Sequence, residues 1–244
     1  MHRIDLSSWS KELWKTSLPH LSIDCVVFGF DGSALNVLLL RTIGESAWSL
    51  PGGYINLNES GEQAARRILT QRTGAERIYL NNFGVFSDPE RSKIYFADYP
   101  DELWHKQRFV NLGYYALVDQ MSVNPKIDQY SDACQWVALN ALPEMVMDHQ
   151  EIITHAYTVL KEQLSYKPIG INLLPDKFTL PELQLLYQAV LGRKLNRGNF
   201  HKKIMRYDIL IQLDEKRKGG AYKSPNLYQF DPEKYHKALK GLDW

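Results

Sequence analysis

The segment 51–75, PGGYINLNESGEQAARRILTQRTGA, constrains the fold more than any other part of the 244-residue chain. The run WSLPGG predicts a short strand that ends at a glycine turn. Residues 59–73 predict a helix, with Asn58 as the N-cap and Gly74 as the terminator. A strand, a loop and a helix are therefore expected in immediate succession.

The elements around this unit predict a mixed α/β domain. LSIDCVVFGFDGSALNVLLLRT has two apolar, β-branched-rich runs around Asp31-Gly32, which is typical of a hairpin. DHQEIITHAYTVLKEQL has an apolar stripe of helical period, and the Pro- and Gly-bearing SYKPIGINLLPD after it marks a domain boundary. Further strands are expected near residues 82–85, 93–98, 109–117 and 135–139.

Across residues 15–165 the chain resembles the Nudix family. That family's box runs Gly, five residues, Glu, seven residues, then Arg-Glu-aliphatic-any-Glu-Glu-any-Gly-aliphatic. The residues that fall in register are Gly53, Glu59, Arg67, Leu69, Gly74 and Ala75. The carboxylates of the second half are replaced by Ile68, Gln71 and Arg72. The resemblance implies a Nudix-type α/β/α sandwich with a mixed sheet.

These three replacements remove the chemistry that Nudix hydrolysis needs. Divalent cations prefer hard oxygen ligands, mainly carboxylates, and they offset the charge that develops on a diphosphate during displacement. Isoleucine and glutamine cannot neutralise a cation, and Arg72 would repel it. We therefore expect no catalytic residues, no metal ligands, no cofactor and no enzymatic function. Glu59 and Arg67 are expected to pair and to brace the junction between loop and helix.

The net charge of +1 hides a division along the chain. Residues 1–167 carry 15 Lys and Arg against 20 Asp and Glu, whereas residues 168–244 carry 14 against 8. An acidic first part and a basic second part are typical of a nucleic-acid-binding tail domain. A solvated basic face explains the charge equally well.

The basic second part begins with a well-capped helix. In FTLPELQLLYQAVLG, Thr179 is the expected N-cap, Pro181 lies in the first turn, and Glu182 completes a capping box. Gly192 is expected to end the helix. Its apolar stripe consists of Leu183, Leu186, Tyr187 and Val190.

A second helix, RGNFHKKIMRYD, follows after a short polar turn, with Phe200, Ile204 and Tyr207 on one face and polar residues on another. Two helices joined by a tight turn, the second exposing Asn, Lys and Arg, predict a helix-turn-helix. ILIQLDEKRKGGAYKSPNLYQF then predicts a strand, a basic glycine loop and a strand, which form a wing. The candidate DNA contacts are Arg197, Asn199, His201, Lys202, Lys203, Arg206, Lys216, Arg217, Lys218 and Lys223. A generic helical tail with a basic surface is the alternative.

A degenerate Nudix domain followed by a winged helix resembles the bacterial Nudix-related transcriptional regulators. We predict an effector-binding domain over residues 1–165 and a winged helix domain over residues 166–244. The resemblance implies a homodimer that binds palindromic, double-stranded operator DNA and responds to a small ligand in the Nudix pocket. Some branches of the family respond to ADP-ribose, and others control the use of pentoses such as arabinose.

The effector itself is less constrained. Without the box carboxylates no metal holds a pyrophosphate, and residues 1–167 are net acidic. Both points favour a neutral sugar, which needs hydrogen-bonding groups beside an apolar surface. A pentose is preferred over ADP-ribose or a related nucleotide, and this preference rests mainly on the resemblance to the regulator family. Candidate contacts, each of which can equally be structural, are Asp24, Arg41, Trp48, Tyr54, Glu59 and Lys93.

Two further functions remain open at this point. The first is a weak Nudix hydrolase with a nucleic-acid docking domain, and the second is a non-catalytic module whose winged helix binds protein. Cys25 and Cys134 form no disulfide framework and lie in apolar runs, so buried free thiols are expected. With no apolar run of membrane-spanning length and no signal-peptide pattern, we expect a cytoplasmic protein that contacts no membrane.

Overall fold

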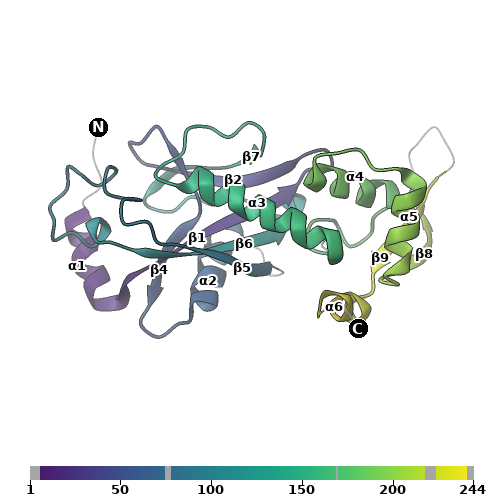
Figure 1. The fold of residues 1–244 in the computed structure, drawn as a ribbon, viewed down its shortest axis with the longest axis horizontal. Coiled ribbons are helices and arrows are strands. Elements are labelled where there is room, and N and C mark those ends of the chain that lie inside the picture. Colours follow the sequence, from purple (N-terminus) through teal and green to yellow (C-terminus); the bar gives the residue numbers. More distant parts are fainter. Residues whose placement is uncertain (1–5, 75–77, 169, 218–223, 241–244) are drawn as a thin grey trace.

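The computed structural model describes residues 6–74, 78–168, 170–217 and 224–240. Within them, seven strands form one mixed sheet (Figure 1). The path β3-β2-β1-β6-β5 has β1 parallel to β6 and its other neighbours antiparallel, while β4 pairs with β1 and β7 with β2. The strands are β1 (Ser17–Phe30), β2 (Leu35–Thr42), β3 (Trp48–Ser49), β4 (Gly52–Asn56), β5 (Tyr79–Phe86), β6 (Val110–Val118) and β7 (Ser131–Ala138).

Helices cover both faces of this sheet. Helix α2 (Gly61–Thr73) packs on one face and helix α3 (His149–Tyr166) crosses the other (Figure 1). The alternation of β1 produces the two cores, because Cys25 and Val27 face α2 while Val26 and Phe28 face α3. The α/β/α sandwich is thus confirmed. Helix α1 (Leu6–Thr16) and the short 3-10 helices η1 (Trp104–Lys106) and η2 (Gln120–Ser122) lie outside these layers.

The predicted hairpin is confirmed, with Phe30 opposite Leu35 across the turn. The side chain of Asp31 holds this turn by accepting hydrogen bonds from the backbone N–H groups of Ser33 and Ala34, both at 2.8 Å. Of the two free cysteines, Cys25 is buried as expected, and Cys134 is only half-buried.

The box helix begins later than predicted. Its N-cap is Ser60 rather than Asn58, because Ser60 and Gln63 form a reciprocal capping box. The side chain of Glu59 is unavailable for this helix, since it bonds to Arg67 and to the backbone of Asn56. Helix α2 ends at Gly74 as predicted, in the left-handed conformation with φ of 64°.

The strand predicted over residues 93–98 is wrong. The segment forms successive turns, in which the N–H of Phe96 donates to the carbonyl of Ser92 and that of Ala97 to Ile94. Its apolar run has another role, because Tyr95 and Phe96 line a cavity instead of lying in a sheet.

The basic part folds as a winged helix. Its elements are α4 (Leu180–Leu191), α5 (Arg197–Arg206), β8 (Leu210–Lys216), β9 (Asn226–Phe230) and α6 (Pro232–Lys240). The capping box of Thr179 and Glu182 is confirmed, and Gly192 ends α4 with φ of 64°. An antiparallel bridge between Phe178 and Tyr228 adds a third strand position beside the β8–β9 wing.

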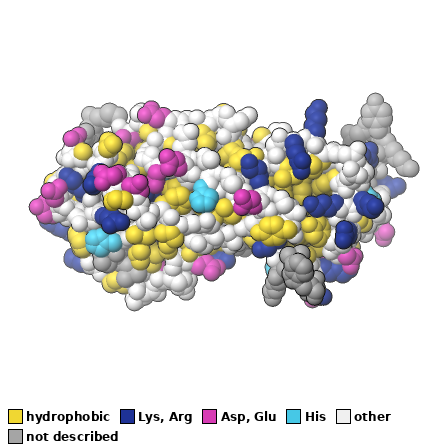
Figure 2. Space-filling model, in the orientation of Figure 1, with side chains coloured by type: hydrophobic (Ala, Val, Ile, Leu, Met, Phe, Trp, Pro, Cys, Tyr) yellow, Lys and Arg dark blue, Asp and Glu magenta, His cyan; other side chains and the backbone are white. Residues whose placement is uncertain are grey.

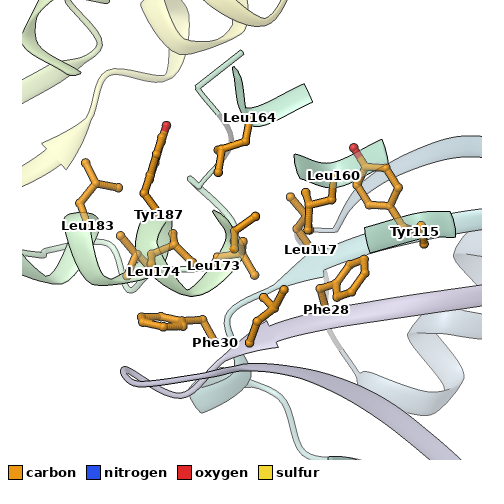
Figure 3. Packing of buried hydrophobic residues seen from close by; sticks show 14 of the residues in the cluster. Phe28, Phe30, Tyr115, Leu117, Leu160, Leu164, Leu173, Leu174, Leu183 and Tyr187 are labelled. Carbon is orange, nitrogen blue, oxygen red and sulfur yellow. The ribbon is translucent and has the colours of Figure 1, made fainter. Parts of the chain in front are cut away.

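One apolar core joins the winged helix to the sheet. Phe30 and Leu117 of the sheet, Leu160 of α3, and Leu183 and Tyr187 of α4 belong to a single cluster of buried side chains (Figure 3). The two parts are therefore packed together as well as joined by the chain. The boundary predicted between residues 165 and 166 falls in the last turn of α3, and it stays a prediction.

Candidate effector site and nucleic-acid interface

A cavity of about 750 Å³ opens beside the box segment. Its walls come from α1, the middle of β1, the Gly52-Gly53 turn, α2, the turns after β5, and the loops around residues 128–131 and 146–149. Segments far apart in sequence thus converge on one space. Its volume lies within the usual range for pockets that bind small molecules.

A buried charged cluster lies at this cavity. Arg91 donates to both carboxylate oxygens of Asp148 at 2.8 Å and to Oδ2 of Asp24 at 3.1 Å. The Arg91 side chain is only 6% exposed, so the bonds to the two carboxylates compensate for its loss of water. Burial opposes the charge of Arg91, but these bonds to Asp148 and Asp24 outweigh it and raise its pKa.

His149 lies next to this cluster, and one of its two ring nitrogens makes a hydrogen bond. Its Nδ1 accepts a hydrogen bond from the N–H of Leu50 at 2.9 Å, which places the ring proton on Nε2. Nε2 is 3.7 Å from Oδ2 of Asp24 and has no hydrogen-bond partner within the described residues. Burial lowers the pKa of His149, although the charges of Asp24 and Asp148 oppose that shift. A neutral N–H donor and a carboxylate acceptor therefore lie side by side beneath the cavity wall, with Nε2 itself covered from solvent.

The first half of the box is used structurally, as predicted. Arg67 donates to Glu59 through Nη2 at 2.5 Å and through Nε at 3.0 Å, and it also donates to the carbonyl of Tyr54 at 2.9 Å. The hydrogen bonds from Arg67 lower the pKa of Glu59, despite partial burial. Glu59 is thus an ionised partner of Arg67 that braces the loop against α2.

The second half of the box does not fit a divalent metal ion. Ile68 is in the core, Gln71 is exposed at the cavity, and Arg72 pairs with Asp128. Three or more His, Cys, Asp or Glu side chains gathered as a possible metal site occur nowhere in the described part of the chain. The residues that stand where Nudix hydrolases hold magnesium are therefore unsuited to it.

Aromatic side chains form another wall of the cavity. Trp9 stacks on Tyr130 with ring centroids 4.2 Å apart and an interplanar angle of 8°, and it also contacts His105 at 4.6 Å. Tyr54 and Phe96 surround the same imidazole at 5.9 and 6.1 Å. Burial lowers the pKa of His105 to about 4, so the ring is neutral at physiological pH. This wall can accommodate a flat ring.

The structure brings only some of the predicted effector contacts together. Asp24 and Tyr54 line the cavity. Arg41, Trp48, Glu59 and Lys93 are not among the lining residues. The reason is local pairing in each case. Arg41 bonds to Asp132 at 2.9 Å and lies over the ring of Trp48, Glu59 is held by Arg67, and exposed Lys93 pairs with Glu90. Arg72, Arg91, His105 and His149 line the cavity, and sequence reasoning missed them.

Helix α5 presents the predicted polar face. Phe200 and Ile204 are buried and Tyr207 is half-buried, which orients the other side of the helix outward. The exposed candidates on α5 are Arg197, Asn199, His201, Lys202, Lys203 and Arg206. Figure 2 shows Lys and Arg gathered over the winged helix, with Asp and Glu more frequent toward the opposite end. The division of charge seen in the sequence is therefore also a division in space.

Two candidate DNA contacts have partners inside the protein. Lys203 donates through Nζ to the carbonyl of Ser165 at 3.2 Å, which directs it toward the end of α3. Arg217, at the end of β8, bonds to both oxygens of Glu182 at 2.7 and 2.8 Å. Lys216 is exposed on the wing. Lys218 and Lys223 lie outside the described residues.

The fold and the cavity together define a protein with a Nudix-type sandwich fused to a winged helix. Residues 18–156 match the family model of the NUDIX domain, and residues 170–230 match that of the NrtR DNA-binding winged helix domain. The chain belongs to the NUDIX domain family and carries an NrtR-type winged helix at its C-terminal side.

Similar proteins include both regulators and an enzyme. The ADPR responsive transcriptional repressor NtrR of Acinetobacter baylyi is 26% identical over 89% of this chain and 84% of its own length. The crystal structure of Shewanella oneidensis NrtR is 27% identical, with a TM-score of 0.73 over 88% of this chain and 96% of that one, and the same protein complexed with a 27mer DNA has a TM-score of 0.72. An RNA pyrophosphohydrolase of Bartonella clarridgeiae is 26% identical over 57% of this chain and 87% of its own.

These relatives correct one expectation from the sequence. The preference for a pentose finds no support among them, because the repressor of Acinetobacter baylyi is ADPR responsive. The alternative, a nucleotide effector, is the better supported one. Among the described residues no helix has the length and apolar character needed to cross a membrane.

Proposed function

We propose that this chain is a transcriptional repressor that binds operator DNA through α5 and the wing, and that ADP-ribose or a closely related nucleotide in the Nudix-type cavity changes that binding. The observation that carries the proposal is the exposed Asn, Lys and Arg face of α5, on a winged helix that is similar to one crystallised with DNA. Asn can bond adenine bidentately and Arg or Lys can contact guanine or phosphate, so this face suits the major groove.

The walls of the cavity match the parts of ADP-ribose. The stacked Trp9 and Tyr130 supply a surface for a base. Arginine guanidinium groups in the lining suit a diphosphate. The His149 and Asp24 pair suits a ribose hydroxyl, which can accept from one and donate to the other. A single pentose would leave most of about 750 Å³ to water, so the size of the cavity also favours the nucleotide.

Helix α3 offers a physical link between ligand and DNA. Its first residue, His149, lies at the cavity, and the carbonyl of Ser165 near its end accepts a hydrogen bond from Lys203 of α5. Because the helix packs in the core that joins both parts, a shift at its start is carried to α5. We further propose that the protein is a homodimer on a palindromic operator, a proposal that rests on the family resemblance. We also propose that it is located in the cytoplasm, where the operator DNA lies.

We assign no hydrolase activity to this chain. The proposal rests on the residues at box positions 68, 71 and 72, which cannot hold the cations that the Nudix reaction needs. Magnesium-dependent release of phosphate from a panel of nucleotides tests this point directly. Brisk turnover by the wild-type protein would refute it.

A gel-shift titration tests the regulator itself. DNA fragments selected from a random pool on the full-length protein serve as probes, and ADP-ribose, ribose and arabinose are added in turn. Of the three compounds, we expect only ADP-ribose to change the affinity for DNA. We also expect DNA binding to weaken as the salt concentration rises. Weak DNA binding that is indifferent to salt would instead point to a protein-binding module. A response to arabinose would restore the pentose as effector.

A further inference from the structure

We infer that Arg72 binds the diphosphate of the effector directly and so takes the place that a metal ion has in Nudix hydrolases. This inference rests on the proposed nucleotide effector. It concerns a residue at which the family box has a glutamate and this chain has a guanidinium. The change reverses the sign of the charge at that point of the cavity wall.

The placement of Arg72 fits this role. Ile68, Gln71 and Arg72 all line the cavity from α2, since positions three and four apart lie on one face of a helix. Ile68 is only 3% exposed and packs near Gly53, so it fixes the distance between the helix and the glycine turn. The Arg72 side chain is 13% exposed, and its neighbours in the wall hold it at the cavity.

Arg72 has more hydrogen-bonding capacity left than the other arginines of the cavity. Arg67 makes three hydrogen bonds, two to Glu59 and one to the carbonyl of Tyr54. Arg91 also makes three, to Asp148 and Asp24. Within the described residues Arg72 makes one, through Nη2, to Asp128. A guanidinium has five N–H donors in a planar fork that matches phosphate oxygens, so most of those of Arg72 remain for a ligand.

The pair with Asp128 positions Arg72 while it occupies only one of the guanidinium N–H groups within the described residues. The N–H of Tyr130 donates to Oδ1 of Asp128 at 2.9 Å, which fixes the carboxylate that Arg72 contacts through Oδ2. Burial opposes ionisation of Asp128, but the hydrogen bonds from Arg72, Ser131 and the backbone of Tyr130, with the charge of Arg72, together outweigh burial and lower the pKa. The guanidinium is therefore oriented before a ligand arrives, so binding has little loss of side-chain entropy to overcome at this residue.

Effector binding should consequently need no divalent cation. Calorimetry with ADP-ribose in EDTA and in magnesium tests this, using the full-length wild type, R72Q, D128N and the control R66Q. Arg66 occupies a variable position of the box, is exposed, pairs with Glu62 and does not line the cavity. We expect equal wild-type affinity in both buffers, a roughly tenfold to hundredfold loss in R72Q, and no change in R66Q.

The D128N variant separates a ligand contact from a structural ion pair. If Arg72 only braces the wall through Asp128, D128N and R72Q should lose affinity alike. If Arg72 contacts the diphosphate, D128N should bind more tightly than R72Q, because the guanidinium is kept and only its orientation is weakened. A requirement for magnesium, or R72Q that binds as the wild type does, would overturn the inference. Failure of the wild type to bind ADP-ribose at all would instead refute the proposed effector.

Discussion

Nε2 of His149 lies 3.7 Å from Oδ2 of Asp24, at the wall of the cavity and with both side chains almost fully buried. The separation is too long for a hydrogen bond. Nε2 is covered from solvent, so a ligand hydroxyl must displace the atoms over it before it can accept from the imidazole N–H and donate to the carboxylate. The proposed function assigns this pair to a sugar hydroxyl rather than to a phosphate.

The first prediction concerns this pair. H149F should weaken ADP-ribose binding roughly fivefold to tenfold, because it removes the Nε2–H donor from a buried site and also the acceptor of the Leu50 N–H. Calorimetry measures the loss. H155Q is the control, since His155 is an exposed residue of the same helix. Equal affinities of H149F and the wild type would show that the ligand does not reach this end of the cavity.

The second prediction concerns pH and stability. The pKa of His105 is lowered by burial to about 4, so the unfolded chain binds a proton at this residue more readily than the folded one does. The free energy of unfolding therefore keeps its full value, as far as His105 is concerned, above pH 6.5. As the pH falls from 6.5 toward 4, the free energy of unfolding decreases by about 3 kcal/mol in total. Urea unfolding of the wild type and H105F across this range should show a shallower pH dependence in the variant. H236N, changed at an exposed histidine, should keep the wild-type slope.

The third prediction concerns DNA recognition by α5. R206A should cost either about 1–3 kcal/mol with relaxed specificity at one base pair, or a smaller and uniform loss. Binding to a set of single-base operator variants distinguishes the two. K203A is the comparison, because Lys203 bonds to Ser165 and should alter base specificity little. Wild-type affinity and specificity in R206A would mean that another face of α5 meets the DNA.

The fourth prediction concerns the wing. Contacts to phosphate release counterions, so replacing Arg217 and Lys218 together by Ala should weaken DNA binding. The slope of log affinity against log salt concentration should become shallower by up to roughly two units. Arg217 is tied to Glu182, and E182Q keeps the capping geometry while removing the competing charge. E182Q should therefore bind DNA at least as tightly as the wild type. An unchanged salt slope in the double variant would mean that the wing only keeps an exposed hairpin soluble.

The fifth prediction concerns restoration of the box carboxylates. I68E, Q71E and R72E together should destabilise the protein, chiefly because Ile68 is 3% exposed and a carboxylate there loses its water. Denaturant unfolding measures this cost. Q71E with R72E should be milder, since Gln71 is exposed and the remaining cost comes from the carboxylate that R72E places beside Asp128. Equal stability of the triple and double variants would show that the core around Ile68 opens to admit a charge.

Local signals predicted much of the fold. The hairpin turn at Asp31-Gly32, the end of α2 at Gly74 and the capping box of Thr179 and Glu182 are all set by residues a few positions apart. The start of α2 was misplaced because three consecutive polar residues compete for the cap. Ser60 takes it through the reciprocal capping box with Gln63, while Glu59 is held by Arg67, eight positions later.

The cavity was harder to predict because its residues meet only through long-range packing. Arg91 and Asp24 are 67 positions apart, and His149 and Leu50 are 99 apart. Nothing within a short window indicates such contacts. Asp24 and Tyr54 were identified because they lie on or next to the box strands, whereas Arg41 was not separable by sequence from a surface ion pair.

The core shared by the sheet and α4 limits how this protein can be taken apart. A winged helix excised for use elsewhere would lose the contacts that α4 makes with α3 and β2. A Nudix-type sandwich taken alone would lose the other side of the same contacts. Such a cut creates two fragments with newly exposed apolar surface rather than two independent domains. A biosensor made from this protein should therefore change only the outward face of α5 and keep the core shared by the sheet and α4.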